Sequence, residues 1–196
     1  MKNKNIKSVY LRLDEKTNAI DYLEKAYIFI KQTENDNMAW KWAIITLHTA
    51  LYGFAICACA GTSPEIVAPK NKKGERQLIS LGKALRYCQD PTYMNMNVSS
   101  KHLTLNNKEI ESINWLKDKF RHQFEHFSPK GWSIELHGMP HILIDILDII
   151  RFLAIETKNI RFTQTQVRKI KSLVFQSKKT LKNSKLYIET EQLDNQ

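Results

Sequence analysis

An uncharged run of 18 residues, from Ala43 to Ala60, constrains the fold of this chain more than any other feature. Its length is close to that of a membrane-spanning helix, which needs about 20 mostly apolar residues. The run also contains Thr46, His48 and Gly53, and much of the rest is Ala and Cys. A helix that is apolar on all sides is equally expected at the centre of a helical bundle. We therefore expect a buried core helix and no membrane contact, with a membrane span as the alternative.

Helical periodicity recurs along the rest of the chain, whose 196 residues include only six Gly and five Pro. Apolar residues three and four apart predict helices at about 14–31, 37–60, 76–89, 106–127, 140–153 and 164–182. Neither the alternation of a strand nor an internal repeat is present. The chain is therefore predicted to be all-α, with a four- to five-helix bundle over residues 1–158 and an additional basic C-terminal helix and tail over residues 159–196.

The net charge is +10, and the basic residues are concentrated near the C-terminus. Residues 157–188 contain nine Lys and Arg and no acidic residue. Such a block is typical of segments that bind nucleic acid or an acidic partner, although a solvated helix face has the same composition. We expect Arg168, Lys169 and Lys171 to contact RNA. Removal of the chain from about Arg161 onward should then weaken RNA binding and leave catalysis intact.

The three cysteines indicate a reducing compartment. Cys57, Cys59 and Cys88 are odd in number and lie in apolar surroundings, whereas a disulfide framework needs a denser, even set. The basic N-terminal segment lacks the apolar stretch of a secretory signal. These features predict a cytoplasmic protein whose cysteines pack in the core and hold no metal.

Two further residue types are predicted to have structural roles. Asp145, Asp148 and Arg151 share one polar stripe of a helix, which is more typical of an ion-paired or solvated face than of paired catalytic acids. The four tryptophans are predicted to pack in the core or at its boundary, because a large apolar ring stabilises most when it is buried.

The segment from Lys119 to Pro129, KFRHQFEHFSP, carries the residues best suited to chemistry. Its phenylalanines recur at helical spacing. At about 100° per residue, Arg121, His122 and His126 all lie off that apolar stripe. Core packing requires neither an arginine nor a histidine at these positions, so these three side chains are candidate functional residues.

An Arg, an adjacent polar residue and a His after four intervening residues resemble the signature of HEPN domains, which are small helical bundles of prokaryotic toxins, antiviral effectors and some RNases. The resemblance covers about residues 14–158, in helix count and motif position. It implies a homodimer in which Arg121 and His126 of both chains form one metal-independent, cofactor-free site that cleaves RNA. His122 would support catalysis, and Lys130 is expected to bind RNA. A role as a toxin or in antiviral defence, with an antitoxin or defence-system partner protein, follows from the same resemblance.

The residue types suit RNA cleavage, in which the 2′-hydroxyl of the substrate is itself the nucleophile. The enzyme must then remove a proton, protonate the leaving oxygen and stabilise charge on the phosphoryl oxygens. Histidine titrates near neutrality and can move both protons. Arginine stays charged and binds phosphate with a planar fork of donors.

Besides the plain interpretation that His122, His126, His137 and His141 are ordinary surface or boundary residues, three others remain open. His122 and His126 are four residues apart, as are His137 and His141, and four histidines can hold a transition metal. Against this, the motif differs from His-Glu-x-x-His, and Pro140 interrupts the second pair. The chain could also be a non-catalytic HEPN-like bundle that binds RNA or a protein. A regulatory helical protein whose basic tail binds DNA is the third interpretation.

Overall fold

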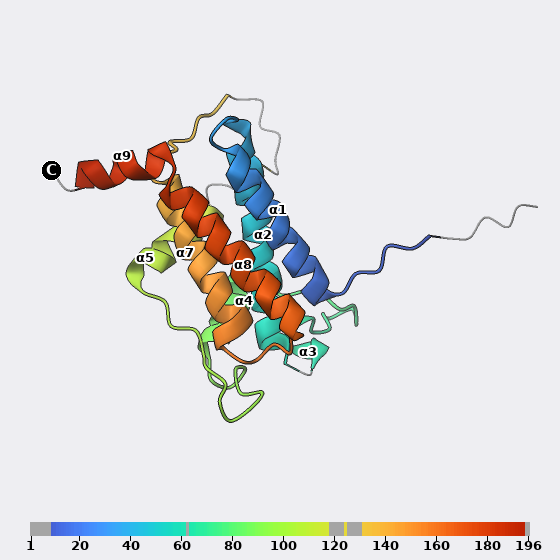
Figure 1. Cartoon of the computed structure of the whole chain (residues 1–196). Helices are drawn as coiled ribbons and strands as arrows, with labels where there is room; N and C mark the ends of the chain where they lie inside the picture. The colour runs from blue at the N-terminus through green and yellow to red at the C-terminus, as the bar shows by residue number, and fades with distance from the viewer. Residues whose placement is uncertain (1–8, 62, 118–123, 125–130, 195–196) are drawn as a thin grey trace, which may run out of the picture.

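The computed structural model describes residues 9–61, 63–117, 124 and 131–194 (Figure 1). Helices make up 65% of these residues, and no strand occurs among them. The elements are α1 (Glu15–Gln32), α2 (Met38–Ala60), α3 (Pro64–Val67), α4 (Leu81–Gln89), α5 (Asn107–Trp115), α7 (Met139–Arg151), a π-helical turn η2 (Phe152–Glu156), α8 (Gln164–Lys182) and α9 (Lys185–Asp194). The predicted all-α class is confirmed.

The uncharged helix α2 lies at the centre of the bundle. It packs against α1, α4 and α7, and α8 in turn contacts α1 and α7 (Figure 1). By length and composition alone α2 could cross a membrane, but 67% of its most apolar 18-residue stretch is buried by the rest of the chain. This burial is the arrangement that a core helix of a bundle requires.

Helices α1 and α2 approach each other closely at Gly53, where there is no room for a side chain. A Cβ atom added at Gly53 would lie 2.9 Å from the Cβ atom of Ala19, which is closer than two such atoms approach in proteins. The next residue, Phe54, is fully buried, and its ring lies edge-on to Phe162 at 6.2 Å between centroids. The small residues therefore set the distance between α1 and α2.

Side-chain caps mark the start of three helices. In each, the side chain of the residue before the helix accepts a hydrogen bond from the backbone N–H of the residue three positions later. The side chain of that later residue accepts a hydrogen bond from the backbone N–H of the capping residue. The pairs are Asp14–Thr17, Asn106–Glu109 and Thr163–Gln166. Because these bonds join residues three apart, the starts of α1, α5 and α8 agree with the prediction.

The helix predicted over residues 76–89 begins five residues later than expected, after the capping residue Ser80. Its first part is extended and pairs with the end of α3 and the chain that follows it: the Ile79 N–H donates to the Val67 carbonyl at 2.8 Å, and the Gln77 N–H donates to the Pro69 carbonyl at 3.1 Å. Leu78 continues the apolar spacing of Leu81 and Leu85, from which this helix was predicted, but its side chain is 51% exposed. Backbone pairing between segments twelve residues apart outweighs the local helical pattern here.

The C-terminal basic helix is part of the bundle core. Four aliphatic residues of α8 are buried against the other helices: Ile170, Leu173, Val174 and Leu181. The expected tail contains one further helix, α9, which turns away from α8 and contacts α7 (Figure 1). Residues beyond 158 therefore complete the core that the earlier helices form, and the expectation that removing them spares catalysis is revised below.

Candidate functional site

The predicted catalytic residues Arg121, His122 and His126, together with Lys130, lie outside the residues that the structure describes. Their roles therefore stay predictions that rest on the sequence. The other three predicted RNA-binding residues lie on α8 and are described, as is one residue within the motif segment.

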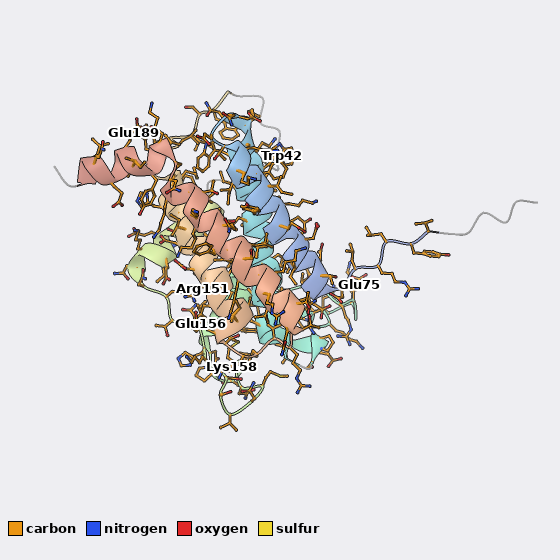
Figure 2. The ribbon with its side chains drawn as sticks, viewed as in Figure 1. Trp42, Glu75, Arg151, Glu156, Lys158 and Glu189 are labelled. Atoms are coloured by element: carbon orange, nitrogen blue, oxygen red, sulfur yellow. The ribbon has the colours of Figure 1, made fainter. Side chains whose placement is uncertain are left out.

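That residue, Phe124, belongs to an aromatic cluster at one end of the bundle. Its ring lies edge-on to Trp132, with centroids 5.0 Å apart, and Lys41 Nζ lies 5.8 Å from its centroid. The same Nζ lies 5.2 Å from the ring of Trp42, which stacks on Phe29 at 6.0 Å. Figure 2 shows Trp42 near the end of the bundle where α1 turns into α2. Both tryptophans are half-exposed, as predicted for boundary positions.

The three predicted RNA-binding residues of α8 are not gathered on one face. Lys169 Nζ pairs with the Glu24 carboxylate of α1 at 2.8 Å. Lys171 lies about 200° further around the helix and lines a groove on the other side. Arg168 is exposed. Lys169 is therefore held by a carboxylate of its own chain, whereas Lys171 faces a groove.

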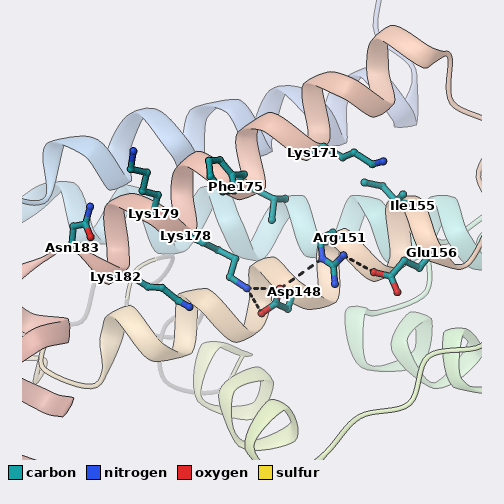
Figure 3. Close-up of a pocket in the computed structure, with 11 residues that line it drawn as sticks. Asp148, Arg151, Ile155, Glu156, Lys171, Phe175, Lys178, Lys179, Lys182 and Asn183 are labelled. Atoms are coloured by element: carbon teal, nitrogen blue, oxygen red, sulfur yellow. Dashed lines mark hydrogen bonds and ion pairs between the residues drawn. The ribbon is translucent and has the colours of Figure 1, made fainter.

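The groove lies between α8 and the end of α7 with η2, and its volume is about 900 Å³ (Figure 3). Its apolar lining is Ile155, Val174 and Phe175. Its charged lining consists of Arg151, Lys171, Lys178, Lys179 and Lys182 with Asp148 and Glu156. Five basic side chains against two acidic ones leave a formal charge of +3, which attracts anions.

Ion pairs neutralise the part of the groove formed by α7 and η2. Lys178 Nζ lies 2.6 Å from both carboxylate oxygens of Asp148, and Arg151 Nη1 lies 2.8 Å from Glu156 Oε1 (Figure 3). Asp145 accepts a hydrogen bond at 2.7 Å from a serine of α5. The predicted polar stripe of α7 is thus paired, and its acids are engaged in structural contacts.

The outer part of the groove is different, because its cations are not neutralised. Within the described part of the chain, no carboxylate lies within ion-pair distance of Lys171, Lys179 or Lys182. Phe175 lies among them on α8 and is 64% exposed. Phe175, Lys179 and Lys182 were not predicted from the sequence as functional residues. The spacing Lys-x₃-Phe-x₃-Lys over residues 171–179 indicates that Lys171, Phe175 and Lys179 share one helix face, because residues four apart are neighbours on a helix.

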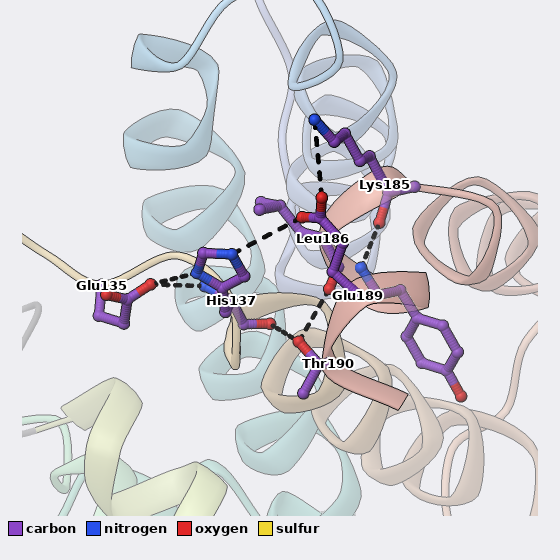
Figure 4. Close-up of polar contacts among 8 residues, drawn as sticks. Glu135, His137, Lys185, Leu186, Glu189 and Thr190 are labelled. Carbon is purple, nitrogen blue, oxygen red and sulfur yellow. Dashed lines mark hydrogen bonds and ion pairs between the residues drawn. The ribbon is translucent and has the colours of Figure 1, made fainter. Parts of the chain in front are cut away.

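Two histidines attach α9 to the start of α7. His137 Nδ1 lies 2.5 Å from Glu135 Oε1, and its Nε2 lies 3.7 Å from Glu189 Oε2 (Figure 4). His141 Nε2 lies 2.8 Å from Glu191 Oε1. These side chains are therefore occupied by carboxylates at the surface where α9 meets α7.

The metal alternative gains no support from the described residues. They contain no group of three or more His, Cys, Asp or Glu side chains placed to share an ion. Two members of the four-histidine set, His122 and His126, lie outside them. The three cysteines are buried, and burial raises the pKa of Cys57 to about 12, so this thiol stays protonated and acts in packing.

We expect the attachment of α9 to weaken as the pH rises. The hydrogen bond to the Glu135 carboxylate raises the pKa of His137 above its ordinary value of 6.5, and the negative charge of Glu189 on α9 adds a smaller rise in the same direction. The stabilisation that protonated His137 gives to this attachment is therefore fully present below pH 6.5, and it is lost as the pH rises through the raised pKa of His137. The pKa of Glu135 is lowered by the same hydrogen bond, so acid disrupts the pair only well below neutrality.

Hydrogen-exchange protection factors of the α9 amides, measured on both sides of neutrality, test this. They should fall at higher pH, and His137→Gln should reduce that dependence while the contact between His141 and Glu191 stays in place. A variant that keeps the full pH dependence would show that another group controls the attachment.

Comparisons of the chain with protein-family models, with curated proteins and with solved structures found no match. Its function is therefore inferred from its own residues.

Proposed function

We propose that this chain is a metal-independent endoribonuclease of the HEPN type. The observation that carries the proposal is the motif of Arg121, the adjacent polar residue His122, and His126, with four residues between Arg121 and His126. An all-helical fold and a net charge of +10 support it, because the first suits a helical-bundle nuclease and the second an anionic polymer as substrate.

In the proposed reaction, His126 of one chain removes the proton of the RNA 2′-hydroxyl, and the 2′-oxygen attacks the adjacent phosphorus. The bond from phosphorus to the 5′-oxygen breaks, and His126 of the second copy protonates that oxygen. Arg121 stabilises the charge on the phosphoryl oxygens, and His122 orients the phosphate. The products are a 2′,3′-cyclic phosphate and a 5′-hydroxyl. A protein that stays monomeric in sedimentation while it cleaves RNA would contradict this shared site.

The resemblance to HEPN domains implies that the enzyme acts in the cytoplasm as a toxin or in antiviral defence, with an antitoxin or other defence protein as its partner.

The second candidate function is RNA binding without cleavage. The basic groove along α8 favours it, because its cations need no catalytic group in order to bind phosphates.

Purified protein is expected to cleave single-stranded RNA in the presence of EDTA and to contain no stoichiometric zinc. Proton transfer by histidine and charge stabilisation by arginine require no metal ion. End-labelled RNA on a gel and elemental analysis of the protein measure the two quantities. Activity that is lost in EDTA and restored by a divalent ion would favour a histidine-bound metal. Binding without cleavage would favour the second candidate.

A further inference from the structure

Phe175 occupies a position that core packing does not explain. The buried residues of α8 lie about 100° or more around the helix from Phe175, whose side chain is 64% exposed. None of the ring contacts found among the described residues involves it. A single exposed apolar residue is ordinary. This one stands in a groove, with Lys171 one turn before it and Lys179 one turn after it (Figure 3).

The unpaired cations form a line along the same face. At about 1.5 Å per residue, Lys171 and Lys182 are about 16 Å apart along the axis of α8. A single strand laid along this line brings more than one of its phosphates within reach of these lysines. The ion pairs of Lys178 and Arg151 hold the other wall in place without using the lysines of the outer face.

We propose that the groove between α8 and the α7–η2 segment binds single-stranded RNA, with Lys171, Lys179 and Lys182 at its phosphates and Phe175 stacked on an unpaired base. The choice of RNA as the ligand rests on the proposed function. The charge of the groove is complementary to a phosphate backbone. An exposed aromatic ring beside that charge adds stacking, which is the combination that single-strand-binding surfaces use.

The single strand is favoured over the duplex because of Phe175. The bases of a duplex are already stacked on one another, so an aromatic ring on a helix surface cannot reach their faces. A single strand presents free base faces, and stacking on an aromatic side chain stabilises each of them irrespective of sequence. The groove should therefore bind single-stranded RNA more tightly than duplex RNA and show little sequence preference.

Fluorescence anisotropy with a labelled 2′-O-methyl oligouridylate tests the proposal, because this probe lacks the attacking hydroxyl and stays intact. Phe175→Ala should weaken binding about tenfold or more, and Phe175→Trp should retain it. Lys171→Gln and Lys182→Gln should each reduce the slope of log affinity against log salt by about 0.7. Circular dichroism checks that every variant keeps its helicity.

Two matched controls lie outside the groove. Lys169 was predicted from the sequence to contact RNA, but it is paired with Glu24 and does not line the groove. Lys169→Gln removes the same charge from the same helix, so the salt slope should stay unchanged. Ile188→Ala removes an exposed apolar side chain from α9 and should not affect binding. If Lys169→Gln reduces the slope as much as Lys171→Gln, binding follows net charge and the groove is not a site.

Further outcomes separate this inference from the proposed function. Wild-type affinity of Phe175→Ala, or equal competition by a blunt RNA duplex, would overturn the stacking site even if the protein cleaves RNA. Loss of binding in the groove variants of a protein that never cleaves RNA would support the site and refute the ribonuclease. Binding of polyglutamate in the groove, with no binding of the oligouridylate, would assign it to an acidic protein and overturn the proposal.

Discussion

Substitution of Arg121 or His126 by alanine is expected to abolish RNA cleavage and leave the bundle folded. A positioned proton-transfer group contributes about 100- to 10,000-fold to a rate, and a charge-stabilising donor a comparable factor. Neither residue belongs to the apolar stripe of its segment, and substitutions outside the core usually change stability by less than about 0.5 kcal/mol. Single-turnover cleavage of labelled RNA and thermal unfolding followed by circular dichroism measure the two effects.

The control is His102→Ala, which removes an exposed histidine from a loop outside the motif and should leave the rate unchanged. His122→Ala should lower the rate less than His126→Ala, because His122 would orient the phosphate without carrying the proton.

An RNA with a deoxy sugar at the cleaved position should not be cleaved, because it lacks the attacking 2′-hydroxyl. If that RNA is cut normally, an activated water is the nucleophile. If both alanine variants cut as fast as wild type, the motif arose by chance.

Truncation of the chain at Arg161 is expected to abolish cooperative folding, contrary to the expectation from the sequence alone. The deletion removes Ile170, Leu173, Val174 and Leu181, which are buried against the rest of the core. Burial of one such side chain stabilises by about 1.5–3 kcal/mol, so four contribute about 6–12 kcal/mol. A domain of this kind has a total stability of about 5–15 kcal/mol, which the loss would largely remove.

The matched control is truncation before Lys185, which removes α9 and keeps α8 complete. No residue of α9 is fully buried among those described, so this shorter deletion should retain a cooperative melt close to that of the full chain. Thermal unfolding followed by circular dichroism compares the two. A cooperative transition in the protein truncated at Arg161 would show that α1, α2 and α7 form a stable core without α8.

Features that depend on neighbours within one or two helical turns were predictable. Asp14, Asn106 and Thr163 cap their helices through bonds to residues three positions later, so the starts of α1, α5 and α8 are visible in the sequence. The uncharged run was predictable as a core helix for a related reason, since a helix without a polar face must be buried on all sides.

Features that depend on distant partners were not predictable. Leu78 continues a helical apolar pattern, but its segment pairs with the chain after α3, and the helix starts only after Ser80. The helix α9 was not predicted from residues 185–194, and none of its described residues is fully buried. The structure shows that carboxylates of α9 there pair with histidines at the start of α7.

By itself the sequence determined the all-helical class, most of the helices, the basic block and the Arg-His motif. These follow from composition and from spacings of a few residues, which local hydrogen bonds and helix geometry translate directly into structure. The tertiary structure decided that α8 belongs to the core and that its lysines differ. Lys169 is paired with a carboxylate 145 residues away, whereas Lys171 faces a groove with Phe175. Such contacts join segments that only the packed bundle brings together, so no local pattern specifies them.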